Sequence, residues 1–360
     1  MLGARLRGIA GPMTWSVRVF GRLDRILLMG QQRAGDCADG DSSCPRFDQR
    51  SSGARVEAEF GAPFGDRNWL RLFAAGGDDF IAGAPTGSHA RPMASVALAD
   101  DLRLPTRVEL HPALRLDRSG SYTALSPAIT ATWQPADGTP LELRAGAGFS
   151  FRPATFSELY LDAGGVLPNP ALVPERAGSL DAGIAWRSRA LTLSAGVFWS
   201  SYAHLILYEY DPPARVKPFS IGSARISGVE LQAIVALPFE FTGEVSWSLL
   251  SAINREAGAQ YGHRLAYRPP QRVFTRLARR GDRVEGYGEL SWTGAMPRNR
   301  YDSALLDAQF VLNAGAGVRA IGPLWLDVEV KNLLDEQTHE DLFQYPLPGI
   351  SLSVIARARL

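Results

Sequence analysis

Apolar and polar residues alternate one by one along much of this chain. Because successive side chains of a β-strand point to opposite faces, this period of two indicates strands with one apolar and one polar face. The alternation is clearest in four segments: 191–200, 241–249, 324–331 and 351–359. In the third of these, Leu324, Leu326, Val328 and Val330 alternate with Trp325, Asp327, Glu329 and Lys331.

The predicted strands are long, and the connections between them alternate in length. The segments run over roughly 10 to 16 residues, against about 5 to 6 in an ordinary globular strand. Short turns are expected at 63–67, 134–139, 187–189, 237–239, 280–282 and 321–323, with one further brief connection near 117–121. Long loops are expected at 30–51, 77–91, 150–175, 209–222, 252–265, 296–304 and 335–349. The pattern predicts an all-β fold, a transmembrane antiparallel β-barrel of about 16 strands, the first of them centred near residue 20.

Composition and charge are compatible with a membrane β-barrel, and they argue against a nucleic-acid-binding protein and against membrane-spanning helices. The 360 residues hold 38 Lys plus Arg and 37 Asp plus Glu, a net charge of +1, which gives no electrostatic reason to expect nucleic acid. No uncharged apolar run reaches the roughly 18 residues of a membrane helix. The mean hydropathy of −0.08 fits a membrane β-barrel, in which only alternate residues face lipid.

Aromatic residues near the ends of predicted strands favour the membrane. Trp and Tyr are enriched where a membrane meets water, so these positions suggest an interfacial girdle. The core of a soluble sandwich also takes large aromatics, and a sandwich also alternates, so a soluble β-rich module stays an alternative. The girdle candidates are Trp133, Trp186, Trp199, Tyr287, Trp247 and Trp292.

Four segments, in order, resemble the TonB-dependent outer-membrane receptors. The first is an aromatic loop, FRPATFSELY at 151–160, which is followed by NPALVPE at 169–175. The second is SARISGVELQAIVALP at 223–238, and the third is AYRPPQRVFTRLA at 266–278. The last is a C-terminal hairpin, in which Asn-Leu-Leu-Asp ends one strand near residue 335 and Pro-Gly precedes the terminal strand.

The resemblance implies a particular place for the chain within that family. It covers residues 105–360 well and 1–104 weakly, so that 1–360 corresponds to a partial receptor barrel without the plug domain. The family closes about 22 strands around its plug, and this chain corresponds to roughly the last 16, with incomplete closure as a possible result. Two positions depart from the family pattern: Ile350 follows the Pro-Gly pair, and the chain ends in Leu360. No secretory signal is evident at the start, which suggests a piece of a longer protein.

Uptake of a scarce ligand is the function that the resemblance implies. The family sits in the outer membrane of Gram-negative bacteria, in contact with its lipid, and takes up large solutes such as siderophores or cobalamin. An inner-membrane protein supplies energy to the intact family, but no coupling box is found in this sequence. The alternative is a passive, porin-like channel. No catalytic constellation, cofactor or metal site is expected, so the chain is not predicted to be an enzyme.

Candidate binding residues are aromatic side chains in the predicted loops. We expect ligand contact from Phe156, Tyr160, Tyr210, Tyr261, Tyr301 and Tyr345. His89, His263 and His339 also fall in predicted loops, where they are either ordinary polar residues or contacts for a metal chelate. Cys37 and Cys44 are close in sequence, which favours a local disulfide over a free thiol pair or a metal site.

Overall fold

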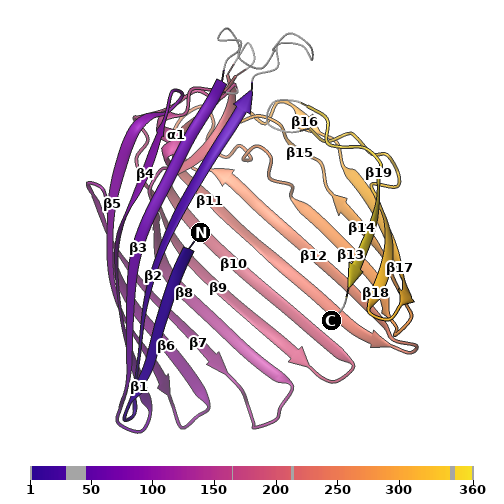
Figure 1. Cartoon of the computed structure of the whole chain (residues 1–360), viewed down its shortest axis with the longest axis horizontal. Coiled ribbons are helices and arrows are strands. Elements are labelled where there is room, and N and C mark those ends of the chain that lie inside the picture. Colours follow the sequence, from indigo (N-terminus) through magenta and orange to yellow (C-terminus); the bar gives the residue numbers. More distant parts are fainter. Residues whose placement is uncertain (1, 30–45, 164, 212–214, 341–344, 359–360) are drawn as a thin grey trace. The chain divides into compact units, whose positions relative to one another are not determined.

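The structure is a computed structural model that describes residues 2–29, 46–163, 165–211, 215–340 and 345–358 (Figure 1). Within these residues it is all-β apart from one short helix, as the alternation predicts. Seventeen strands form one sheet, and β15 and β16 form a separate pair. No helix in the described ranges is both long enough and apolar enough to cross a membrane. Cys37 and Cys44 lie outside these residues.

The strands of the main sheet are mostly 8 to 23 residues long, longer than in typical globular folds. The first half of the chain forms β1 (Leu2–Ala10), β2 (Met13–Met29), β3 (Arg46–Phe64), β4 (Asn68–Gly83), β5 (Gly87–Arg103), β6 (Val108–Ser119), β7 (Tyr122–Trp133), β8 (Leu141–Arg152), α1 (Phe156–Tyr160) and β9 (Glu175–Arg187). The second half forms β10 (Leu191–Asp211), β11 (Arg215–Leu237), β12 (Phe241–Asn254), β13 (Gln271–Arg280), β14 (Val284–Thr293), β15 (Met296–Pro297), β16 (Leu305–Leu306), β17 (Gln309–Ile321), β18 (Leu324–Lys331) and β19 (Ser351–Ala358).

Strands that follow one another along the chain pair antiparallel. Successive strands pair in this way from β1 to β6, and again from β11 through β14, β17 and β18 to β19. Two strands replace the single one expected near residue 20, because Gly11, with φ of +59°, closes a tight turn between β1 and β2. The sheet therefore holds one strand more, over the described residues, than the sequence pattern suggested.

Connections at the two ends of the strands differ, and we name the ends accordingly. The turn end carries the connections 11–12, 65–67, 104–107, 134–140, 188–190, 238–240, 281–283 and 322–323. The loop end carries the connections after β4, β6, β8, β12, β14 and β18, of which those at 153–174, 255–270, 294–308 and 332–350 are long. Long connections thus follow β8, β12, β14 and β18 at the loop end, while the connections at the turn end are all short.

Two of the predicted long loops are wrong, because strand continues through them. β4 and β5 pair as far as Gly83 and Gly87, so 77–91 is a tight hairpin rather than a loop. A Cβ on Gly77, which lies in this hairpin, would be 2.1 Å from the Ala54 carbonyl oxygen. The glycine therefore permits close strand contact. Most of 209–222, the second of these predicted loops, is also strand, because β10 runs to Asp211 and β11 begins at Arg215.

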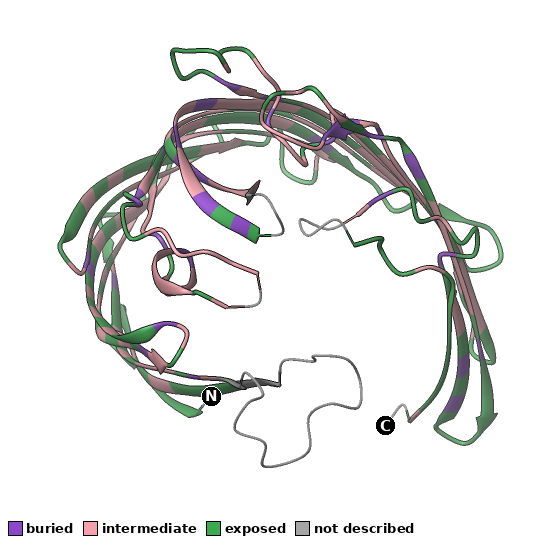
Figure 2. Ribbon diagram, turned by 90° about the horizontal axis from the view of Figure 1, so that it is seen from above, coloured by how far each residue is buried: buried purple, intermediate pink, exposed green. Residues whose placement is uncertain are grey.

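The chain divides into two compact units, which we describe separately. Unit 1 comprises 1–131, 147–178 and 203–221, and unit 2 comprises 132–146, 179–202 and 222–360. Buried residues are scattered along the strands instead of gathering in one core, as Figure 2 shows. One face of the strands in each unit carries exposed leucine, valine and aromatic side chains, among them Leu98, Leu114, Val197 and Leu326.

The opposite face carries cross-strand ion pairs. In unit 1, Arg71 on β4 bonds Asp101 on β5 at 2.8 Å. In unit 2, Arg276 on β13 bonds Glu289 on β14 at 2.6 Å, in direct register across the ladder. Tyr287 belongs to this polar face and not to an aromatic girdle, because the Arg276 guanidinium lies 4.7 Å from its ring centroid. In these two pairs, a charge on one strand is neutralised by the opposite charge on the neighbouring strand.

Candidate functional site

The connection between β8 and β9, at the loop end, is held by a helix cap, ion pairs and a small apolar cluster. It contains α1, whose first turn is closed by a capping box between Thr155 and Glu158. The Glu158 amide donates to Thr155 Oγ1 at 3.2 Å, and the Thr155 amide donates to Glu158 Oε2 at 2.6 Å. These two bonds satisfy amides that a five-residue helix leaves free, so the sequence Thr-Phe-Ser-Glu fixes the start of the helix.

Arg152, the last residue of β8, holds both ends of this connection. Its Nε and Nη2 donate to the two oxygens of Glu175 at 2.5 and 2.8 Å, and its Nη1 donates to Glu158 at 3.1 Å. The side chain of Arg152 is 40% exposed, whereas those of Glu158 and Glu175 are 8% and 12% exposed. Glu175 Oε1 also accepts from the Ile206 amide at 2.7 Å. The Arg152 guanidinium therefore joins three segments, namely the end of β8, the helix α1 and the start of β9.

The Asn-Pro-Ala-Leu-Val-Pro-Glu segment packs this loop against β10 and β11. Asn169 Nδ2 donates to the Pro218 carbonyl oxygen at 2.9 Å. Leu172, only 4% exposed, joins Ala154 and Ile206 in a small apolar cluster. Glu175 is the first residue of β9. The segment is thus a clamp that fixes the shape of the loop.

Phe156 and Tyr160, two of the predicted ligand contacts, face strand β5. The Tyr160 ring stacks on His89 with centroids 3.5 Å apart and planes at 4°, and the Arg91 guanidinium lies 4.5 Å from the Phe156 ring centroid. His89 is therefore in a strand and not in the loop where we expected it, and its Nε2 lies 2.9 Å from the Thr86 carbonyl oxygen. The two aromatic side chains join α1 to the β4–β5 hairpin.

The other four predicted contacts lie in separate segments. Tyr210 is half-buried near the end of β10 and, like Phe156 and Tyr160, belongs to unit 1. Tyr261, Tyr301 and Tyr345 belong to unit 2 and are 51%, 51% and 68% exposed. An Arg side chain from the same loop lies over each of the first two rings, at 4.5 Å and 5.0 Å. The structure thus keeps these tyrosines at the surface of long loops.

Ion pairs also order the loops of unit 2. Arg264 donates to both oxygens of Asp302 at 2.8 and 2.7 Å, which joins the 255–270 loop to the 294–308 loop. These hydrogen bonds hold the pKa of the Asp302 carboxyl below its ordinary value. His339 is 5% exposed, and its Nε2 lies 2.8 Å from the Asp307 carbonyl oxygen, so the ring is engaged in loop packing. No group of three metal-ligating side chains occurs within the described ranges.

A polar cavity of about 570 Å³ lies in unit 1 beside the β8–β9 connection. Its lining includes Arg55, Arg115, Asp117 and Ser119, with Phe73 below Arg115. Ser119 is 6% exposed, and its buried hydroxyl has no hydrogen-bond partner among the described residues. Sequence reasoning did not find this cavity, because its side chains come from strands that are far apart in the sequence.

Long amphipathic strands in an antiparallel series, short turns at one end and ordered loops at the other define the class of outer-membrane β-barrel proteins. The family model described as TonB dependent receptor-like, beta-barrel matches residues 14–333. The chain belongs to this family. Its members are transporters and not enzymes, and they reside in the outer membrane of Gram-negative bacteria.

Solved structures of the same fold agree with this assignment. A mutant of the ferric enterobactin receptor PfeA from Pseudomonas aeruginosa has a TM-score of 0.73 and 15% identity over 96% of this chain and 59% of that chain. The copper transporter OprC has a TM-score of 0.76 and 15% identity over 97% and 64%. The ferric citrate transporter FecA has a TM-score of 0.73 and 13% identity over 98% and 60%. The chain therefore spans roughly three fifths of their length, and no curated protein matches it.

Proposed function

We propose that the chain forms the wall of a ligand-uptake receptor in the outer membrane of a Gram-negative bacterium. Its loop end faces the outside, and its turn end faces the periplasm. Family membership supports this orientation, because bacterial outer-membrane barrels have short periplasmic turns and long extracellular loops. In the intact receptor an inner-membrane protein supplies the energy for uptake.

The ligand that we propose is a large, scarce solute such as a siderophore, cobalamin or a similar metal chelate. The observation that carries this proposal is the Arg152-centred loop, which gives the loop end a fixed shape beside a polar cavity. Two structural neighbours carry ferric enterobactin and ferric citrate in their names, and a third carries copper. Exposed Tyr261, Tyr301 and Tyr345 offer aromatic surface to such a solute.

Binding is the property to test first. The refolded chain in detergent is titrated with ferric enterobactin, ferric citrate, cobalamin and Cu²⁺ while its tryptophan fluorescence is followed. We expect saturable binding of one of them, weakened by Tyr301→Ala or Tyr345→Ala. Absence of binding to all four, together with steady ohmic conductance in planar bilayers, would instead establish the passive channel.

Energised uptake requires more than the residues described. We propose that this stretch of polypeptide supplies the wall and the loops of the receptor. Vesicles that contain it are expected to show no uptake that depends on a proton-motive force, and such uptake would refute this part of the proposal.

A further inference from the structure

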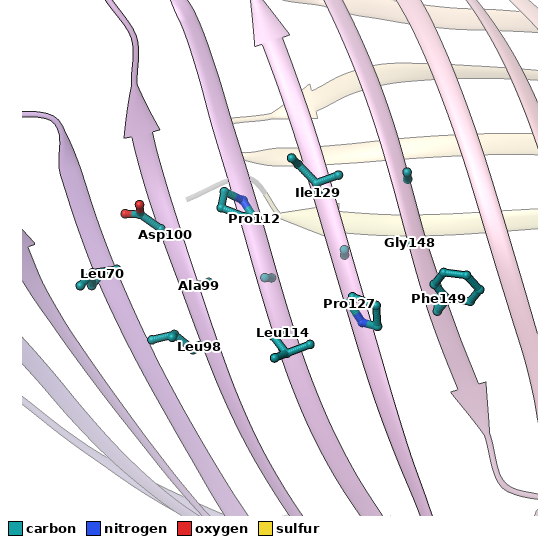
Figure 3. A pocket seen from close by; sticks show the side chains of 13 residues that line it. Leu70, Leu98, Ala99, Asp100, Pro112, Leu114, Pro127, Ile129, Gly148 and Phe149 are labelled. Carbon is teal, nitrogen blue, oxygen red and sulfur yellow. The ribbon is translucent and has the colours of Figure 1, made fainter.

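A groove of about 540 Å³ runs across the apolar face of unit 1, over strands β4 to β8 (Figure 3). Exposed side chains of Leu98, Leu114, Ile129 and Phe149 border it. This is the face that meets lipid if the proposed function holds, and the inference below rests on that function. An apolar depression of this size fits part of an acyl chain.

Prolines shape the floor of the groove. Pro112 on β6 and Pro127 on β7 lie between the larger side chains, as Figure 3 shows. The β5–β6 ladder pairs Ala99 with Ala113 and resumes at Leu102 with Leu110, so that the register places Asp100 opposite Pro112. Proline has no amide hydrogen to donate, which explains why the ladder is interrupted at this point.

Asp100 lines the same groove, and its carboxylate is only partly satisfied. On β5 it shares the apolar face with Leu98, because side chains alternate along a strand. Asn68 Nδ2 donates to Asp100 Oδ2 at 2.5 Å. The second oxygen, Oδ1, is buried and has no hydrogen-bond partner among the described residues. The nearby Arg71 belongs to the opposite face, where it bonds Asp101.

The position of Asp100 along the strand indicates what could complete its bonding. It lies three residues before Arg103, the last residue of β5, and so about 10 Å from the turn end. In the proposed orientation this is the headgroup region of the periplasmic leaflet. A carboxylate on a lipid-facing surface is costly unless it is paired.

We propose that this groove binds a phospholipid with a primary ammonium headgroup, such as phosphatidylethanolamine. One acyl chain lies in the groove, and the ammonium group donates to the Asp100 carboxylate. Rotation of the carboxyl group about its terminal torsion, which is soft in Asp, lets one oxygen meet the ammonium while the other keeps the Asn68 bond. A quaternary ammonium has no N–H to donate, and an anionic headgroup is repelled, so the site discriminates by headgroup.

The test compares lipids that differ only in their headgroups. The chain is reconstituted with equal amounts of phosphatidylethanolamine, phosphatidylcholine and phosphatidylglycerol bearing the same acyl chains. It is then extracted in mild detergent, and retained lipids are counted by native mass spectrometry. We expect phosphatidylethanolamine to be enriched about tenfold over the other two, as a charged hydrogen bond to a carboxylate implies.

Variants test whether Asp100 and the groove are responsible for the enrichment of phosphatidylethanolamine. Asp100→Asn keeps the size and a hydrogen-bond acceptor, so it is expected to fold and to lose the enrichment, whereas Asp100→Glu is expected to keep it. Asp66→Asn, an exposed carboxylate in the 65–67 turn at the same end, serves as the matched control and leaves the enrichment unchanged. Ala147→Leu, which narrows the groove, lowers retention of all three lipids.

Two kinds of result would overturn the inference. The first contradicts only the lipid site, and the second also contradicts the proposed function. Equal retention of the three lipids by the wild-type chain, or unchanged enrichment in Asp100→Asn, contradicts the ammonium site while the membrane assignment stands. A chain that retains no lipid and stays in solution without detergent contradicts the proposed function as well.

Discussion

Replacing Arg152 with alanine removes the cation that pairs with both buried carboxylates of the β8–β9 connection. The substitution leaves Glu158 and Glu175, 8% and 12% exposed, without their guanidinium partner. Breaking a buried ion pair by removing one partner costs about 3–5 kcal/mol. The Arg152 side chain is itself 40% exposed, and solvent screens its share, so we reduce the expected loss to about 2–3 kcal/mol.

The loss is expected to be local, and hydrogen exchange followed by mass spectrometry measures it. Opening of the segment 153–174 then becomes about 30- to 150-fold more frequent, since each 1.4 kcal/mol corresponds to a factor of ten. The Ile206 amide, which donates to Glu175, loses protection with it. Strands β12 to β14 belong to unit 2, whereas Arg152 belongs to unit 1. They serve as an internal reference and are expected to keep their exchange rates.

A matched variant, Arg187→Ala, shows how much stability is lost when an ordinary, more exposed ion pair is removed. Arg187 pairs with Glu142 at 2.9 Å near the turn end, with side chains 55% and 23% exposed. Arg187→Ala is expected to change stability by less than about 1 kcal/mol. The double change Arg152→Met with Glu175→Gln recovers part of the loss by removing one buried charge. Equal exchange in Arg152→Ala and Arg187→Ala, or unchanged protection of 153–174, would refute the clamp.

Three further predictions concern packing, strand contact and pH. Leu172→Ala empties the apolar cluster under the loop and costs about 2–4 kcal/mol, measured as a lower urea midpoint for cleavage of the loop by protease. Gly77→Val cannot keep the native ladder, because its Cβ would lie 2.1 Å from the Ala54 carbonyl oxygen, and the folded, heat-modifiable band on gels is expected to be lost. The lowered pKa of Asp302 means that its bond to Arg264 contributes stability above the ordinary carboxyl pKa of about 4. This contribution is lost as pH falls through the depressed folded value, so the difference in Tm between wild type and Asp302→Asn is constant from pH 7 to about 5 and shrinks below about 4.

The first two of these predictions have matched controls within the chain. Gly21→Val is expected to fold, since the nearest atom to its Cβ is 3.8 Å away. Leu347→Ala, at a position 40% exposed, is expected to cost less than Leu172→Ala. A Gly77→Val chain that folds normally, or a Tm difference for Asp302→Asn that grows at low pH, would contradict the corresponding argument.

The alternation of side chains predicted an all-β chain, because a half-buried strand constrains every second residue, and the lengths of strands and connections favoured a barrel over a sandwich. It predicts the strands around 191–200, 241–249 and 324–331, and the resemblance of 151–175 leads to the family. The loop predicted at 77–91 is wrong, and this segment contains glycine and aspartate, residues that are common in loops; glycine also permits close contact between strands. Composition alone does not separate these two uses.

The candidate site depends on contacts that no linear pattern contains. The aromatic residues Phe156 and Tyr160 were expected from the loop, but their partners on β5, His89 and Arg91, are visible only once the strands are placed. Arg152 offered one sequence signal, a cation directly before a Thr-x-x-Glu capping box. Asp100 gave a weaker one, since a carboxylate among alternating apolar residues, between Leu98 and Leu102, is out of place on a lipid-facing strand.

The central claim is that the strands form a barrel wall with one face toward lipid and the other toward an aqueous interior. Spin labels placed one at a time along 94–101 of β5, in a chain reconstituted into bilayers with its native cysteines replaced, test it directly. We predict that collisions with oxygen peak at even positions such as Val96 and Leu98, while collisions with a water-soluble nickel complex peak at odd ones. Equal access of the nickel complex to both sets of positions would contradict the account.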